Sequence, residues 1–173
     1  LEGRVGLGQA LLDTHPIPSP AALPLIHPSR RWVLVLDGRI DNRSDLLARL
    51  HIEDCPASLS GDGQLVLAAY EKWGQACSEH LLGDFAFAIW DGRCQTLFCA
   101  RNPSSARQFH YHYNPKFLRF ASDVSQVLLD PRVPGDLDGN HLADSLMGTF
   151  DDLARSPFAA VQKLKAGYCL TFD

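Results

Sequence analysis

The chain has 173 residues, of which 46% are hydrophobic and 21% are charged, with a formal net charge of −4 and a sequence pI of about 5.9. A chain of this length can bury a substantial core as one domain without disulfide staples. Its mild acidity argues against a nucleic-acid partner, which would show as clustered Lys and Arg. No window approaches the roughly 18 uninterrupted apolar residues of a membrane span, and no signal pattern opens the chain, so no membrane partner is expected.

The cysteines are scattered along the chain without any C-x-x-C spacing. There are five of them, Cys55, Cys77, Cys94, Cys99 and Cys169. An odd number leaves at least one thiol outside any intramolecular disulfide scheme, so a reducing compartment is the simplest interpretation and we expect a cytoplasmic protein. The chain also begins at Leu1 rather than at a methionine. We therefore expect that its N-terminal edge has been trimmed.

The first strands are predicted from apolar runs. Residues 5–12 read as a short strand, and the prolines at 16, 18 and 20 make the next segment a loop because proline lacks a backbone donor. The continuous apolar run 32–36 predicts a strand that is buried on both faces. The following pair Asp37-Gly38 is typical of a turn, so this strand is expected to end there.

Helices are predicted where apolar residues recur at helical spacing behind a capping residue. One carries the apolar side chains of 46–50, another closes at Gly74, a third is stopped by Pro131, and the last carries Leu142 and Leu146. A side-chain oxygen at the N-cap can accept a bond from an otherwise unpaired N–H of the first turn. The N-cap candidates, in chain order, are Asn42 or Ser44, Asp62, Ser122 or Asp123, and Asp138.

Two β-hairpins are predicted in the middle of the chain. The runs 85–90 and 96–100 are joined at an Asp-Gly turn, and the runs 109–113 and 117–121 at an Asn-Pro turn. A last strand should occupy 167–172. Hairpins and amphipathic helices in this proportion predict antiparallel sheets covered by helices.

Several motifs follow one another in a fixed order along the chain. They are D-G-R-I-D-N-R at 37–43, D-G-Q at 62–64 leading into A-Y-E-K-W-G at 69–74, L-G-D-F-A-F-A-I-W-D at 82–91, A-R-N at 100–102, F-A-S-D at 120–123 and L-K-A-G-Y at 164–168. Together they resemble the class II glutamine amidotransferase domain of asparagine synthetases, which belongs to the N-terminal-nucleophile (Ntn) hydrolases. The resemblance implies an α+β fold, a four-layer α-β-β-α sandwich with antiparallel sheets, and a single domain over 1–173.

The same resemblance implies how such a domain hydrolyses glutamine. In the family an N-terminal cysteine attacks the side-chain amide, and its own α-amino group serves as the base. Leu1 carries no nucleophile, and none of the internal cysteines carries a free amine. We therefore expect no catalytic residue in this chain.

The pocket positions implied by the family motifs point the same way. Asp37 stands where the family has an asparagine whose amide stabilises the oxyanion, and Gly38 keeps the backbone N–H. A carboxylate offers no donor and would repel the developing negative charge. Arg39 replaces the glutamate that receives the substrate ammonium, and Leu11 aligns with the arginine that clamps the substrate carboxylate.

Asp62 is retained at the family's second ammonium-contacting position, although a helix N-cap explains it as well and is the interpretation we favour. Asn102 for Asp, Ser105 for Gly and Gln108 for Pro depart from the R-D-x-x-G-x-K-P-L-Y-Y motif. The vestigial pocket positions are Leu11, Asp37, Gly38, Arg39, Gly61 and Asp62. Their joint change indicates that selection for glutamine binding has been lost.

One branch of the family is similar to this chain in more detail. Residues 37–43 and 98–101 resemble the lasso-peptide macrolactam synthetases. Those enzymes activate a side-chain carboxylate with ATP and let the N-terminal amine of the same peptide attack it, so they need no ammonia. The wider family resemblance implies asparagine biosynthesis, and this branch implies a peptide substrate for the parent enzyme.

Other tempting features have plainer interpretations. His110-x-His112 could hold zinc, but no supporting ligand lies nearby, and two polar residues on the solvent face of a strand explain the pair better. The aromatic run of Phe85, Phe87 and Trp90 is interpreted as core. The acidic residues Asp136, Asp138, Asp151 and Asp152 are interpreted as loop and cap residues, so no metal site is predicted.

The ATP-binding S-G-G-x-D-S loop of the family does not occur in this sequence. ATP and Mg²⁺ are therefore expected in a C-terminal synthetase domain, on the same chain or on a partner, and no cofactor in this one. The leading hypothesis is a degenerate amidotransferase domain that serves as a scaffold in an asparagine synthase-like, ATP-dependent amide ligase and has no activity alone. The alternatives are an active glutaminase whose N-terminal Cys was trimmed, or a free-standing binding module. The sequence allows a homo-oligomer but does not specify the oligomeric state.

Overall fold

The computed structural model describes residues 5–10, 24–52, 61–104, 106–149 and 152–173. The first sheet is antiparallel with the order β1-β2-β3-β4-β8. Its strands are β1 (Leu25–Ile26), β2 (Trp32–Ile40), β3 (Gly83–Asp91), β4 (Thr96–Arg101) and β8 (Cys169–Phe172). The second sheet is also antiparallel, with the order β6-β5-β7. Its strands are β5 (His110–Asn114), β6 (Phe117–Ala121) and β7 (Gln162–Lys163).

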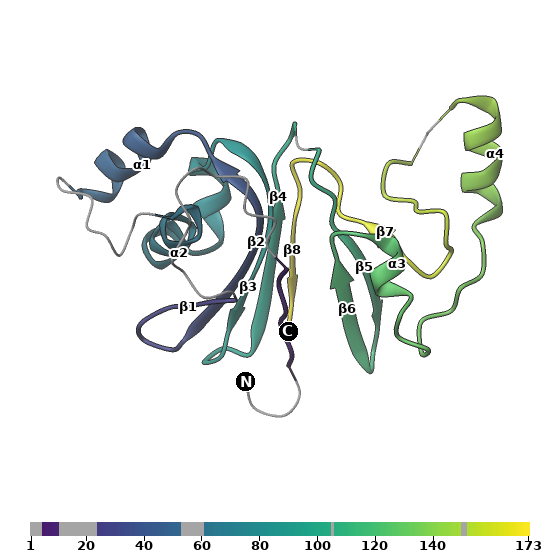
Figure 1. Ribbon diagram of the computed structural model, residues 1–173, viewed down its shortest axis with the longest axis horizontal. Coiled ribbons are helices and arrows are strands. Elements are labelled where there is room, and N and C mark those ends of the chain that lie inside the picture. Colours follow the sequence, from purple (N-terminus) through teal and green to yellow (C-terminus); the bar gives the residue numbers. More distant parts are fainter. Residues whose placement is uncertain (1–4, 11–23, 53–60, 105, 150–151) are drawn as a thin grey trace.

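Helices lie on the outer sides of the two sheets, and the last of them stands apart at the outer edge of the molecule (Figure 1). They are α1 (Arg43–Leu50), α2 (Asp62–Trp73) with the 3₁₀-helix η2 (Gly74–His80) directly after it, α3 (Val124–Val127) and α4 (Gly139–Met147). Figure 1 shows α1 and α2 on one face of the first sheet, the second sheet beyond its other face, and α3 against the far side of the second sheet. The layers therefore follow the order α-β-β-α, which confirms the predicted sandwich. No helix in the described ranges is long and apolar enough to cross a membrane.

The central strands are apolar on both faces because each face is covered. Alternate side chains of β3 point in opposite directions, so Phe85 and Phe87 pack under the helices while Ala86 and Ala88 face the second sheet. Burying each phenylalanine contributes about 1.5–3 kcal/mol. This packing confirms that Phe85 and Phe87 of the predicted aromatic run belong to the core, while Trp90 is partly buried and packs against the core between the sheets.

Three of the predicted caps lie where the sequence indicated. Asp123 accepts a bond from the backbone N–H of Ser125, and Asp138 does the same for His141, at 2.8 and 3.0 Å. Gly74 follows the last residue of α2 with a positive φ of 58°. These residues mark helix ends because they satisfy or accommodate local backbone, which a short stretch of sequence reveals.

The predicted turn at Asp37-Gly38 is wrong. β2 continues through this pair to Ile40, and Gly38 lies opposite Phe85 of β3. Gly38 has φ +138°, and a Cβ at this position would lie 2.0 Å from the carbonyl oxygen of Asp84. Glycine is thus required here by the close approach of a neighbouring strand rather than by a reversal of the chain.

The predicted strand at 5–12 is also not found over residues 5–10, while 11 and 12 lie outside the described residues. In place of backbone pairing, the side chain of Gln9 forms hydrogen bonds with the backbone of β2 at Leu36. Its amide Nε2 donates to the carbonyl oxygen of Leu36 at 2.5 Å, and its Oε1 accepts from the Leu36 N–H at 3.1 Å. One side chain therefore satisfies both backbone groups of Leu36.

Candidate functional site

Most of the predicted pocket positions meet around the end of β2. Asp37, Gly38 and Arg39 lie on this strand, with Arg39 opposite Asp84 of β3, and the N-terminus of α2 lies beside Ile40. Asp37 and Arg39 share a strand face because side chains alternate along a strand. Leu11 lies outside the described residues. The structure therefore brings together five of the six predicted positions. They are Asp37, Gly38 and Arg39 on β2, and Gly61 and Asp62 at the start of α2.

Asp37 forms an ion pair with a residue that the sequence did not single out. Nη1 of Arg107 lies 2.9 Å from Oδ1 of Asp37, and Nε of Arg107 lies 3.4 Å from Oδ2 of Asp84. The guanidinium thus bridges two carboxylates from adjacent strands, and all three side chains are roughly half-exposed. At this position the protein offers a carboxylate that is already engaged as an acceptor.

Arg39 points to a different partner. Its Nε donates to Oδ1 of Asp41 at 2.8 Å, and both side chains are mostly exposed. An exposed pair of this kind contributes about 0–1 kcal/mol. The arginine therefore adds a positive charge at the end of β2 without being held rigidly.

Asp62 is not the N-cap that the sequence predicted. Gly61 occupies the cap without a side-chain bond, and Asp62 is the first residue of α2. Its Oδ2 accepts from the backbone N–H of Ile40 at 3.2 Å, and its Oδ1 accepts from Nη1 of Arg43 at 3.3 Å. The role is still structural, because the carboxylate joins the end of β2 to the positive N-terminus of the helix.

Asn102 lies next to this region and is almost fully buried. Its side-chain Nδ2 donates to the carbonyl oxygen of Gly83 and to Oγ of Ser104, and its backbone N–H donates to Phe85 at 3.1 Å. In the described part of the chain its Oδ1 has no hydrogen-bond partner. The residue fastens the end of β4 to the start of β3, and an amide can do this because it has N–H groups that a carboxylate lacks.

A comparison with known families shows which family this chain belongs to. A family model described as "Glutamine amidotransferase domain" matches residues 1–173. The chain belongs to this family. Curated relatives that match the chain include several named as asparagine synthetases.

Two curated relatives illustrate the similarity of the amidotransferase domain. Asparagine synthetase [glutamine-hydrolyzing] 3 of Bacillus subtilis (strain 168) is 25% identical over 143 residues, which cover 82% of this chain and 23% of that protein. A putative asparagine synthetase [glutamine-hydrolyzing] of Mycobacterium tuberculosis (strain ATCC 25618 / H37Rv) is 42% identical over 74 residues, or 42% of this chain and 11% of that protein. The matched region thus spans less than a quarter of either relative.

Solved structures support the fold of the amidotransferase domain alone. The glutamine phosphoribosylpyrophosphate amidotransferase from B. subtilis, complexed with ADP and GMP, superposes with a TM-score of 0.50 at 16% identity over 61% of this chain and 25% of that one. A structure of the allosteric regulatory enzyme of purine biosynthesis gives a TM-score of 0.55 at 15% identity over 86% of this chain and 28% of that one. Both share the overall fold of this chain.

His110 and His112 do not lie on a solvent face, as the sequence had suggested. Both are buried, and Nδ1 of His112 lies 2.7 Å from the carbonyl oxygen of Ala160 while Nδ1 of His110 lies 3.3 Å from that of Ser122. Burial lowers the pKa of His110. The second sheet is covered by the later part of the chain, which a local pattern does not reveal. Among the described residues there is no group of three or more metal-ligating side chains.

The acidic residues interpreted as loops and caps have ordinary partners where they are described. Asp138 caps α4, and Oδ1 of Asp152 lies 3.2 Å from Nζ of Lys165. The backbone carbonyl of Asp136 accepts from the N–H of Ala159 at 2.9 Å. Asp151 lies outside the described residues.

Proposed function

We propose that this amidotransferase domain does not hydrolyse glutamine and serves as a scaffold for the synthetase domain of an asparagine synthase-like, ATP-dependent amide ligase. The observation that carries the proposal is the ion pair between Asp37 and Arg107 at the position of the oxyanion donor. A carboxylate has no hydrogen to donate, and its charge opposes the oxyanion. Loss of one such donor costs about 2.7–4 kcal/mol of barrier.

The synthetase domain would supply the chemistry of amide formation. The relatives are several times longer than the region they share with this chain, which supports a second domain on the same polypeptide or on a partner. ATP and Mg²⁺ would bind there. The proposed product is an amide within a peptide, as in the lasso-peptide branch. A cytoplasmic location is supported by the free thiols of Cys77, Cys94, Cys99 and Cys169.

The test is a glutaminase assay on the full-length parent protein. Ammonium release from glutamine is measured beside asparagine synthetase 3 of B. subtilis, whose name records glutamine hydrolysis and which serves as the positive control. The expected result is background release from the parent and turnover from the control. Glutamine-dependent turnover above background would overturn the proposal.

A second function is favoured by the names of the relatives, which record glutamine hydrolysis. It requires a cysteine upstream of Leu1 that becomes the N-terminal nucleophile. Reading the gene upstream for Met-Cys, and downstream for the S-G-G-x-D-S loop, separates the two functions. A phosphate-binding loop without the cysteine supports the scaffold, whereas Met-Cys supports the glutaminase. A gene that ends near Asp173 would instead favour a free-standing binding module.

A further inference from the structure

α4 presents its apolar side chains to solvent. Leu142, Leu146 and Met147 are 43%, 89% and 68% exposed, whereas the polar residues His141 and Asp144 of the same helix are buried. A surface helix normally buries its apolar stripe and exposes its polar face. α2 follows that rule, because its buried residues are almost all apolar. α4 is inverted.

Polar contacts fix α4 in this orientation. Oδ2 of Asp144 lies 3.5 Å from Nη1 of Arg155, and the Asp138 side chain caps the helix at the N–H of His141. Turning the helix to bury its leucines would break the ion pair between Asp144 and Arg155 and move the side chains of His141 and Asp144 out of their buried positions. These polar contacts of Asp138 and Asp144 therefore hold the apolar face of α4 toward solvent.

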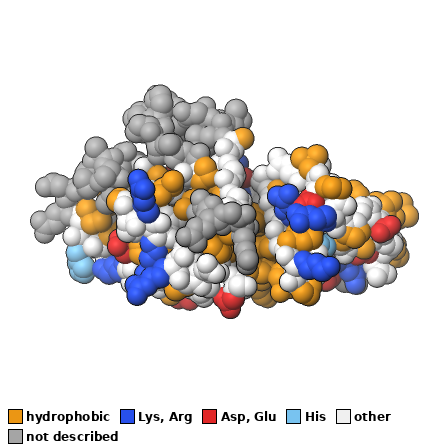
Figure 2. Space-filling model, turned by 90° about the horizontal axis from the view of Figure 1, so that it is seen from below, with side chains coloured by type: hydrophobic (Ala, Val, Ile, Leu, Met, Phe, Trp, Pro, Cys, Tyr) orange, Lys and Arg blue, Asp and Glu red, His pale blue; other side chains and the backbone are white. Residues whose placement is uncertain are grey.

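Exposed apolar residues also flank the helix. Leu137 precedes it and Leu153 follows it, and both side chains are more than half exposed. We refer to Leu137, Leu142, Leu146, Met147 and Leu153 as the α4 patch. α4 lies at the outer edge of the molecule, on the side of the second sheet away from the first (Figure 1). Figure 2 views the molecule from below, the side away from α4, and shows hydrophobic side chains interspersed with charged ones on its right-hand half. Exposed apolar clusters such as the α4 patch mark interaction surfaces.

The aspartates around the α4 patch are already engaged within the chain. Asp144 pairs with Arg155, Asp152 pairs with Lys165, and the side chain of Asp138 caps α4. The patch therefore presents apolar side chains whose neighbouring charges have partners, and an apolar groove is the surface that fits it.

We propose that the α4 patch docks against the synthetase domain of the parent enzyme, in an apolar groove of that domain. The inference rests on the proposed function, since the synthetase domain is the partner that the longer relatives indicate. Docking buries the leucines that this chain leaves exposed, and it stabilises α4 against local opening.

Hydrogen–deuterium exchange of the α4 amides tests the docking. The 173-residue chain is compared with the full-length parent under identical conditions. In the parent, α4 amides are expected to exchange more slowly by about tenfold or more, because docking suppresses local opening. Equal exchange in a parent that contains a synthetase domain overturns the docking surface but leaves the scaffold function standing. Protection that instead rises with the concentration of the isolated chain identifies a second copy as the occupant and also overturns it.

Paired variants separate docking from helix stability. In the parent, Leu146→Glu is expected to restore fast exchange of α4, whereas Ile26→Glu leaves it slow, because exposed Ile26 lies on β1 at the opposite end of the molecule (Figure 1). Leu146→Glu with α4 still protected would overturn the proposal. Glutaminase turnover combined with a protected α4 would refute the scaffold function and retain the docking surface. A parent without a synthetase domain would refute both.

Discussion

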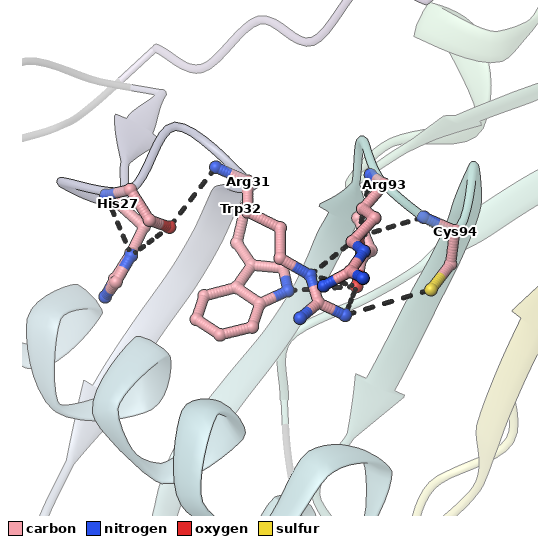
Figure 3. A network of polar contacts seen from close by, with 7 residues as sticks. His27, Arg31, Trp32, Arg93 and Cys94 are labelled. Atoms are coloured by element: carbon pink, nitrogen blue, oxygen red, sulfur yellow. Dashed lines mark hydrogen bonds and ion pairs between the residues drawn. The ribbon is translucent and has the colours of Figure 1, made fainter.

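At the scale of single residues, Asp91 shows how a buried charge is accommodated at the end of the first sheet. Figure 3 shows Arg31 and Trp32, at the start of β2, directed toward the turn that carries Arg93 and Cys94. Asp91 accepts from Nη2 of Arg31 at 2.7 Å, from Nε1 of Trp32 at 3.0 Å and from the backbone N–H groups of that turn. Burial alone would raise its pKa, but these hydrogen bonds outweigh it and hold the pKa of Asp91 well below its ordinary value.

The lowered pKa leads to a stability prediction for Asp91→Asn. A carboxyl whose pKa is lower in the folded state contributes stability that is fully present above the unfolded value of about 3.9 and is lost as the pH falls toward the folded value. The variant should lose about 1.5–3 kcal/mol at pH 7, the range for hydrogen bonds to a charged group. Urea denaturation at pH 7 and at pH values below about 4 measures this difference. A gap between wild type and variant that does not shrink in acid would contradict the assignment to Asp91.

Asp37→Asn addresses the pocket at the same scale. The substitution removes one of the two carboxylates that hold Arg107, and because these side chains are about half exposed, stability should change by less than about 1 kcal/mol. It also supplies the missing amide donor. In a parent without an N-terminal cysteine, ammonium release from glutamine should remain at background for both proteins. A large gain in turnover, toward the roughly 10²–10³-fold effect of an oxyanion donor, would show that a nucleophile is present after all.

At the scale of elements, the pairing of β2 with β3 depends on Gly38. The Gly38→Ala variant would place its Cβ against the carbonyl oxygen of Asp84 in a backbone conformation that side chains rarely adopt. We expect a loss of more than about 2 kcal/mol, from strain and displacement of the strand. Gly139→Ala is the matched control, because nothing lies within 4 Å of its added Cβ, and it should be neutral or slightly stabilising. Thermal or urea unfolding of both variants measures the contrast. Equal effects would argue against the close approach.

The same element shows what the sequence could and could not predict. The apolar run at 32–36, the hairpins and the caps Asp123 and Asp138 follow from neighbours within a few residues, and they were predicted correctly. The pair Asp37-Gly38 resembled a turn in the sequence. Glycine is required there by the close approach of β3, which lies far along the chain and is not visible in a local pattern. Arg107 escaped notice for the same reason, since 70 positions separate it from Asp37. The sequence therefore grouped residues that do lie together around the end of β2, but it did not reveal Arg107, the cation that pairs with Asp37.

At the scale of the whole molecule, the first sheet separates two hydrophobic cores and contributes side chains to both. Cys77 belongs to the core under the helices, and Cys99 of β4 belongs to the core between the sheets. Both thiols are fully buried, whereas Cys94 and Cys169 are exposed. Burial raises the pKa of Cys77 to about 12 and raises that of Cys99 as well, so neither thiol should react at neutral pH in the folded protein.

The two buried thiols therefore test whether the cores unfold together. Variants that retain only Cys77 or only Cys99, with the other cysteines, including Cys55, replaced by serine or alanine, are labelled with a thiol reagent at increasing urea concentrations. Because β2, β3 and β4 supply side chains to both cores, opening one core should expose the other. Both thiols should then become reactive at the same urea midpoint, which should match the loss of circular dichroism. Labelling of Cys99 at a lower midpoint than Cys77 would instead mean that the second sheet detaches first and that the two cores are separate cooperative units.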